Sequence, residues 1–483
     1  MSLAENPLPE MNHPALSVRR RDVLRAGLGG FALQDVWLRQ LQAESARSSS
    51  PSPKQKAHSC VFIFLFGGPS HVDLWDLKPD APIEIRGDFQ SIETASPGVR
   101  ICEHLPLLAQ QMERFCLLRS MTHRMPVHGP ACSEIYSGRP YFGAPVTDQA
   151  REEDWPSIAS LVHRFGGPGD AAKAEGRLPH SIVLPWYTQF VGQDKRIAGQ
   201  TGARMGEQFN PFLVEGNLTD PEFRVRGLRL PGEVSVDRFS RRRSLRSQLE
   251  PHGLSESQQT FQTRVADGNF EAAAALVERT EAAGVLDLSR EPDSTRDRYG
   301  RTRFGQSLLM ARRLVEADVS LVTVNWDDDH KDDKVSPYWD THVENFPKLK
   351  DRLCPPFDRA MSTFLADLDE RGLLESTLVV ALGEFGRRPK IGLVTQNGMT
   401  KKTGRDHWPH AFTALVAGGG VHGGQAFGAT TRNGGYVADS PVTPADLAAT
   451  IFQHLGIDPG TRYHDHFLQT RQPLTTGRPV DLC

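Results

Sequence analysis

The sequence predicts an α/β protein with a doubly wound, mostly parallel sheet flanked by helices. Short continuous apolar runs, rich in β-branched and aromatic side chains, recur along the chain. Such runs are typical of strands buried on both faces, as in parallel sheets. Amphipathic segments with helical spacing lie between them, and no segment repeats at a fixed period. Alternation of the two kinds of element favours this fold class over all-α and all-β folds.

The elements follow in order along the chain. The first strand is expected at 60–66 (CVFIFLF) and ends at a Gly-Gly-Pro turn. Gly372 marks the end of one helix, and Thr443-Pro444 marks the start of another. Further strands are expected at 114–119, 181–184, 320–325, 377–382 and 411–417. Helices are expected at 357–371 and 443–455, with another ending at 311–315.

The N-terminal region is expected to be an export signal. Residues 20–25 (RRDVLR) fit the twin-arginine pattern, and the weakly apolar stretch after them is too short to span a bilayer. We expect a twin-arginine signal region at 1–45, a Ser/Pro-rich linker at 46–58 and a single α/β domain at 59–483. Export would bring the protein to the periplasm or the extracellular space. A basic amphipathic helix is the alternative for the first segment.

Residues 194–300 differ in composition from the rest of this domain. They are charged, punctuated by Gly and Pro, and helical in pattern from about Ser257. We expect a partly helical insertion or cap rather than a separate catalytic module. No later stretch has the continuous apolar length that a membrane span requires.

Composition excludes some classes of protein. With 56 basic and 59 acidic residues the charge is nearly balanced, so a nucleic-acid partner is not expected. The six cysteines are scattered without a CxxC pair, which argues against a zinc ribbon or a thioredoxin-like site. Buried thiols are favoured over disulfides.

Motifs rich in Asp, Glu and His lie near the ends of the predicted strands. YWDTH places Asp340 and His342 two apart, so that both can face one ion, and GRDH offers His407 before a buried strand. Ligands bind open α/β sheets at the carboxyl ends of the strands. Imidazole with carboxylate suits a divalent metal. A lone histidine is more often a structural hydrogen-bonding group, but a set of three such residues at sheet edges favours a metal site.

Several motifs together resemble a known family. They are GGPSHVDLWDLKP, CEHLPLLA, SMTH, WDTH, GEFGRRP and GRDHWP, spread over roughly residues 55–475. They resemble the family catalogued as domain of unknown function 1501, a sulfatase-like branch of the alkaline phosphatase superfamily. The resemblance implies an alkaline phosphatase/sulfatase-like fold and one metal position made of Asp340, His342 and His407.

The second metal position of the superfamily departs from its pattern in this chain. Gly67-Gly68 stands where an Asp is expected, Glu384-Phe385 where Asp-His is expected, and His128 where the nucleophile is expected. Three alternatives remain open for His128. It is a metal ligand, with Glu384 and Asp73 or His71 completing a rebuilt site; or it is a nucleophile or general acid/base; or the second site is lost.

Other polar residues in these motifs have expected roles beside the metal. Arg387, in the pair with Arg388, is expected to bind a phosphate or sulfate group, since a guanidinium offers two parallel hydrogen bonds; a surface cation pair is the alternative. His410 and Asp406 are expected to orient the ligands.

Two functions follow from the resemblance and its departures. The first is an exported hydrolase of phosphate or sulfate esters that uses one or two ions of Zn, Mn or Ca and a metal-activated water or His128. Its substrate would be a phosphorylated or sulfated small molecule or polysaccharide. The second is a non-catalytic secreted binding or scaffold protein with the same fold. The intact set of metal ligands favours the first, and the missing nucleophile favours the second.

Overall fold

The computed structural model describes residues 55–143, 150–166, 178–190, 195–223, 284–328, 336–392, 404–465 and 467–482, with a few positions between 225 and 245 and residue 330. The chain divides into the units Met1–Ser52 and Pro53–Cys483, and every described helix and strand belongs to the second unit. The expected signal region at 1–45 lies outside the described residues, as do most of the expected linker and the stretch 246–283 of the expected insertion.

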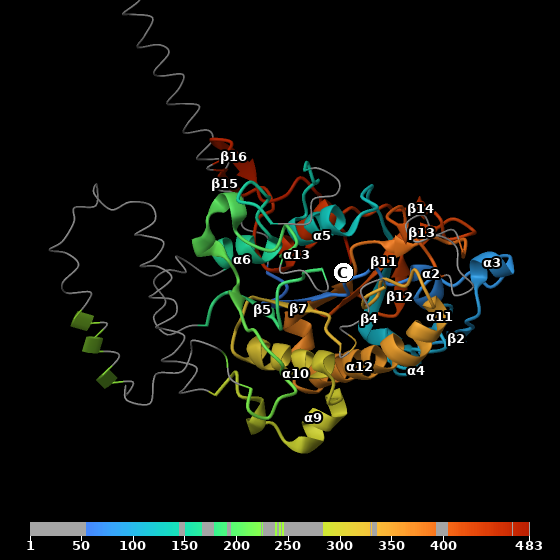
Figure 1. The fold of residues 1–483 in the computed structure, drawn as a ribbon, viewed down its shortest axis with the longest axis horizontal. Coiled ribbons are helices and arrows are strands. Elements are labelled where there is room, and N and C mark those ends of the chain that lie inside the picture. The colour runs from blue at the N-terminus through green and yellow to red at the C-terminus, as the bar shows by residue number, and fades with distance from the viewer. Residues whose placement is uncertain are drawn as a thin grey trace, which may run out of the picture. The chain divides into compact units, whose positions relative to one another are not determined.

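An eight-stranded sheet forms the centre of the second unit, in the order β12-β4-β11-β8-β1-β7-β5-β6 (Figure 1). Its strands are β1 (Ser59–Phe64), β4 (Phe115–Met121), β5 (Ser181–Leu184), β6 (Phe212–Leu213), β7 (Leu321–Asn325), β8 (Thr377–Leu382), β11 (Phe412–Ala417) and β12 (Gln425–Phe427). Every neighbouring pair is parallel except those of β11, which runs antiparallel to both β4 and β8. The predicted fold class is therefore confirmed.

Helices cover both faces of this sheet, as a doubly wound fold requires (Figure 1). On one face lie α5 (His128–Ser137), α6 (Ile158–Phe165) and α13 (Pro444–His454); on the other lie α9 (Asp293–Tyr299), α10 (Arg303–Glu316) and α12 (Cys354–Glu370). The start of α13 is fixed by a capping box, in which the Thr443 side chain accepts from the Asp446 N–H and the Asp446 carboxylate accepts from the Thr443 N–H.

The described part of the second unit also contains four short helices and four two-stranded sheets. The short helices are α2 (His71–Leu74), α3 (Ile83–Arg86), α4 (Pro106–Ala109) and α11 (Asn345–Lys348). Two-stranded sheets pair β2 (Ser91–Glu93) with β3 (Arg100–Cys102), β9 (Gly386–Arg387) with β10 (His407–Trp408), β13 (Ala429–Thr430) with β14 (Val437–Asp439), and β15 (Arg462–Asp465) with β16 (Thr470–Pro473).

The strands at the centre are buried along their whole length. All six residues of β1, β8 and β11 are buried, which explains their unbroken apolar sequence. The five cysteines within the described ranges are also buried and free, as the sequence favoured. Among the helices of these ranges none is long and apolar enough to cross a bilayer.

The direction of β11 matters for the site. The parallel strands β1, β4 and β8 end at one edge of the sheet, and antiparallel β11 begins at that same edge. Residues that follow the first three strands and residues that precede β11 therefore meet there. This topology brings the motifs after residues 66, 121 and 382 together with the GRDH motif.

Candidate metal centre

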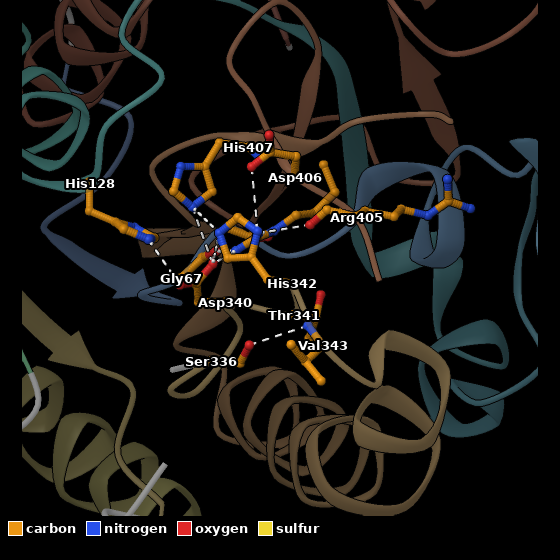
Figure 2. Close-up of polar contacts among 12 residues, drawn as sticks. Gly67, His128, Ser336, Asp340, Thr341, His342, Val343, Arg405, Asp406 and His407 are labelled. Atoms are coloured by element: carbon orange, nitrogen blue, oxygen red, sulfur yellow. Dashed lines mark hydrogen bonds and ion pairs between the residues drawn. The ribbon is translucent and has the colours of Figure 1, made fainter. Parts of the chain in front are cut away.

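Three histidines surround the carboxylate of Asp340 at this edge (Figure 2). His342 Nε2 lies 3.1 Å and His407 Nε2 3.2 Å from Asp340 Oδ1. His128 Nε2 lies 3.2 Å from the other oxygen, Oδ2. The two Nε2 atoms of His342 and His407 are 2.8 Å apart. The Asp340, His342 and His407 predicted to share one ion thus converge, and the His128 ring lies beside them, 4.3 Å from that of His407.

The other nitrogen of each imidazole is directed at an acceptor. His128 Nδ1 lies 2.5 Å from Glu384 Oε1, and His407 Nδ1 lies 2.8 Å from the carbonyl oxygen of Pro126. His342 Nδ1 lies 3.4 Å from Asp406 Oδ1. The acceptors behind His128 and His407 fix the orientation of these two rings and leave Nε2 directed at the centre, the arrangement common around metal-binding histidines.

The positions of the ring hydrogens in this cluster show whether a cation would fit it. The Pro126 carbonyl only accepts, so His407 carries its hydrogen on Nδ1 and presents a lone pair at Nε2. Burial and the neighbouring His128 lower the pKa of His407, and burial and Arg387 lower the pKa of His342 to about 3, so both rings are neutral.

Neither neutral form of His342 satisfies its surroundings. With its hydrogen on Nδ1, two Nε2 lone pairs meet at 2.8 Å; with its hydrogen on Nε2, the Nδ1 lone pair faces the Asp406 carboxylate. That Nδ1 has no hydrogen-bond partner among the described residues. A cation between Asp340 Oδ1 and the two Nε2 atoms removes the conflict, so the residues present fit a divalent metal.

Glu384 lies on the Nδ1 side of the His128 ring, opposite the nitrogen that faces Asp340. Its carboxylate is fully buried and accepts from the Gly67 N–H at 3.0 and 3.1 Å as well as facing His128 Nδ1. Burial opposes the charge on His128, but the Asp340 and Glu384 carboxylates prevail and raise its pKa to about 9. The expected metal ligand Glu384 therefore contacts His128, and none of its hydrogen bonds or ion pairs among the described residues reaches Asp340, His342 or His407.

Arg387 is placed differently from the expectation of a substrate-binding guanidinium. It is fully buried in β9, opposite His407 in the β9–β10 ladder. Its Nη2 lies 2.5 Å from Asp340 Oδ1, and its Nε donates to the Gly68 carbonyl at 2.9 Å. Against the cost of burial, this guanidinium and His128 hold the pKa of Asp340 well below its usual range. Arg387 thus orients Asp340, stabilises its ionised form and does not face solvent.

Asp73, expected as a ligand, does not reach the centre. Both of its oxygens bind the buried Arg405, at 2.7 Å to Nε and 2.8 Å to Nη2. Ser70 Oγ and Asn345 Nδ2 donate to the same carboxylate at 2.6 and 2.9 Å. Its lone pairs are thus used by the protein itself, and the physical reason is the long-range pairing with Arg405.

The two residues expected to orient ligands have separate fates. Asp406 lies beside His342 Nδ1 and accepts from the His407 N–H at 3.0 Å. His410 points elsewhere: its ring packs 4.9 Å from Trp408 and 5.4 Å from Tyr436. His410 therefore contacts no residue of the Asp340 cluster through any of these interactions.

Two further residues support the centre without having been assigned a role from sequence. Gly67 has φ +113°, and a Cβ there would lie 2.2 Å from the Asp340 nitrogen, so only glycine allows the two backbones to approach. His123 Nε2 donates to the Glu384 carbonyl at 2.6 Å, and burial lowers the pKa of His123 to about 4. The signals were the glycine pair after β1 and the SMTH motif after β4.

Comparison with known proteins gives a family and distant structural similarities. Ps i-CgsB (11% identity, 83% of this chain and 72% of that chain, TM-score 0.37) and the PsFucS1 sulfatase from Pseudoalteromonas sp. (12%, 92% and 76%, 0.34) are among the similar solved structures. Another is a protein in the alkaline phosphatase superfamily from Vibrio parahaemolyticus (12%, 84% and 68%, 0.34). Scores this low carry no argument about function.

The sequence itself gives a stronger result. The comparison with curated proteins found no match. A family model described as "Protein of unknown function (DUF1501)" matches residues 57–481, close to the extent of the resemblance noted from the motifs. Because the match spans far more than half of the sequence, the chain belongs to the DUF1501 family.

Proposed function

We propose that this protein is a metal-dependent hydrolase of phosphate or sulfate esters. One observation carries the proposal: Nε2 of His342, Nε2 of His407 and Oδ1 of Asp340 lie 2.8 to 3.2 Å from one another. A set of three protein ligands is typical of catalytic zinc sites, whereas structural zinc sites have four. A bound divalent cation would polarise an ester oxygen and lower the pKa of water.

His128 is the residue proposed to move a proton. It faces the second oxygen of Asp340, and its side chain is 12% exposed, more than those of His342 and His407 at 2% and 4%. Glu384 fixes its Nδ1 and favours a hydrogen there, which leaves Nε2, beside Asp340 Oδ2, to take up or release a proton. The neighbouring rings of Phe66 and Phe385, 5.2 and 5.1 Å away, limit the access of water.

Arg387 has a supporting part in this scheme. Its charge stabilises ionised Asp340 from the side remote from solvent, so that the carboxylate stays a ligand over a wide pH range. The substrate's anionic group would then be bound chiefly by the cation. Zn and Mn suit the imidazole-rich set better than Ca, which prefers oxygen ligands throughout.

We also propose export by the twin-arginine route. The support is the RRDVLR pattern at residues 20–25. Arg20→Lys combined with Arg21→Lys should retain the protein in the cytoplasm, as measured by fractionation. Undiminished export of that variant would remove the proposal.

Metal content and hydrolysis measured on the same variants test the hydrolase. Wild type should bind about one equivalent of metal by mass spectrometry of the elements and hydrolyse 4-nitrophenyl phosphate or sulfate. His407→Ala should lose both properties, whereas His128→Ala should keep the metal and lose hydrolysis. The exposed His422 serves as the matched control, because His422→Ala removes an imidazole that takes part in none of the contacts described for the cluster. The metal centre would be refuted if wild type purified without chelator contained no metal and if adding Zn or Mn changed neither its metal content nor its hydrolysis.

A non-catalytic binding protein is the second candidate. What favours it is the absence of a hydroxyl or thiol from the described cluster of Asp340, its three histidines and Asp406. This candidate predicts full metal loading with no hydrolysis of either aryl ester, and equal behaviour of wild type and His128→Ala. The hydrolase predicts that the two differ.

A further inference from the structure

A hollow of about 420 Å³ opens beside the segment that carries His407. Its walls include Thr122, which follows β4, and His410, and its floor is the stretch from Tyr436 to Pro441. The volume lies within the range of small-ligand sites. His410 and Tyr436 lie outside the metal centre, so the metal site leaves the second half of the GRDHWPH motif without a chemical role.

Two aromatic side chains pack against the exposed ring of Tyr436 at this hollow. Tyr436 is 54% exposed, unusual for so large an apolar surface. Trp408 packs against it at 5.5 Å and 70°, and His410 lies at 5.4 Å and 31°. Trp408 Nε1 in turn donates to the Gly435 carbonyl. These contacts restrict the Tyr436 ring before any ligand arrives, which lowers the entropic cost of stacking a flat face against it.

A carboxylate and two hydroxyl groups line part of the hollow, beside apolar residues of the same stretch. Asp439 and Ser440 are exposed, and Ser440 Oγ donates to Asp439 Oδ2 at 3.1 Å. Thr122 adds a second hydroxyl. A carboxylate and two hydroxyls beside a tyrosine face suit a ligand that offers several hydroxyl donors around an apolar face, which is the chemistry of a sugar ring.

The hollow and the metal centre share the same pair of chain segments. The His123 N–H donates to the Pro409 carbonyl at 3.0 Å, and His407 Nδ1 faces the Pro126 carbonyl at 2.8 Å. These two contacts clamp 123–126 against 407–409, with His407 at one end and His410 beyond the other. A ligand held at His410 therefore lies next to the segment that delivers His407.

We propose that this hollow is a sugar-binding subsite, with the Tyr436 ring as its stacking platform and Asp439 as the acceptor of sugar hydroxyls. The inference rests on the proposed function in one respect: it makes the substrate a saccharide ester, whose esterified unit lies at the metal centre and whose neighbouring ring lies in the hollow.

Direct binding tests the subsite without any catalysis. The probes are methyl glycosides of glucose, galactose, mannose and fucose, with lactose and cellobiose, titrated into the full-length metal-loaded protein up to about 20 mM so that millimolar affinities are seen. Calorimetry reports binding, as does intrinsic tryptophan fluorescence, to which Trp408 beside Tyr436 contributes. At least one probe should bind, and Tyr436→Ala and Asp439→Asn should each weaken it about tenfold or more. Phe142→Ala is the control, since Phe142 is another exposed aromatic residue, at 78% exposure.

The results separate this inference from the hydrolase itself. Saccharide binding that Tyr436→Ala abolishes supports the subsite even when neither aryl ester is hydrolysed, and then the hydrolase alone fails. Aryl ester hydrolysis without binding of any saccharide overturns the subsite alone. Binding that is indifferent to Tyr436→Ala, or adenosine binding as tightly as the best saccharide, also overturns it, because stacking of any flat ring would then explain the data.

Discussion

Removing the Asp73 carboxylate should destabilise the fold and leave the metal in place. Asp73 and Arg405 are both fully buried and joined through two oxygens at 2.7 and 2.8 Å. Asp73→Asn leaves the Arg405 guanidinium buried with its charge uncompensated, which typically costs about 3–5 kcal/mol. Since the carboxylate binds no atom of the Asp340 cluster, the ligand geometry should survive wherever the variant folds.

Calorimetry should detect a loss of this size. An unfolding entropy of about 2.1 cal/mol/K per residue over the unit 53–483 gives about 0.9 kcal/mol/K, so Tm should fall by roughly 3–6 °C. Metal content is measured on the same samples. Combining Asp73→Asn with Arg405→Gln should lower Tm by less than the sum of the single changes, because the second substitution removes the stranded charge.

Two results would refute this reasoning. A Tm within one degree or so of wild type would mean that the buried pair stabilises little. Loss of metal from Asp73→Asn at an unchanged Tm would restore the ligand role that the sequence alone had predicted for Asp73.

Further changes test other parts of the structure. Gly67→Ala should weaken metal binding about 10–100-fold in chelator competition, since the new Cβ would lie 2.2 Å from the Asp340 nitrogen, and an unchanged affinity would contradict the close approach. Burial lowers the pKa of His163 to about 4, below its unfolded value of about 6.5. Between these two pH values the unfolded chain binds more protons than the folded one, so stability falls as pH drops from about 6.5 to about 4. His163→Gln should flatten that fall in denaturant titrations, and equal pH slopes for the variant and wild type would count against this account. Mass spectrometry of peptide 125–139 should show unmodified Cys132, which is fully buried in α5, whereas a formylglycine there would mean that His128 was aligned wrongly.

Most of the fold was predictable because its strands are buried on both faces. Unbroken apolar runs at β1, β8 and β11 gave strand positions to within a residue or two, and Gly372 correctly marked the end of α12. The short edge strands β6 and β12 were missed. Their few residues are half-buried or exposed and carry no apolar run, so nothing local distinguishes them from loops.

The site was predictable only in part, for a similar reason. Asp340 and His342 lie two residues apart, and that local spacing was visible in the sequence. The roles of Asp73 and Arg387 were not visible, because their partners are 332 and 47 positions away. The sequence does not distinguish a carboxylate or guanidinium that faces a ligand from one that pairs with another side chain of the protein. Only the fold shows that Asp73 pairs with Arg405 and Arg387 with Asp340.

The carboxylates around the centre differ in what faces them, and that difference singles out Asp340. Three of them face groups that donate hydrogen without any ion, namely Asp73, Glu384 and Asp406. Asp340 Oδ1 also accepts from a guanidinium, but beside that bond it lies within 3.2 Å of two neutral imidazole Nε2 atoms, of which at most one can carry a hydrogen. Asp340 is therefore the one of these four carboxylates that has an unprotonated imidazole Nε2 within 3.2 Å of its oxygen. An ion placed there is the arrangement that satisfies all of them at once.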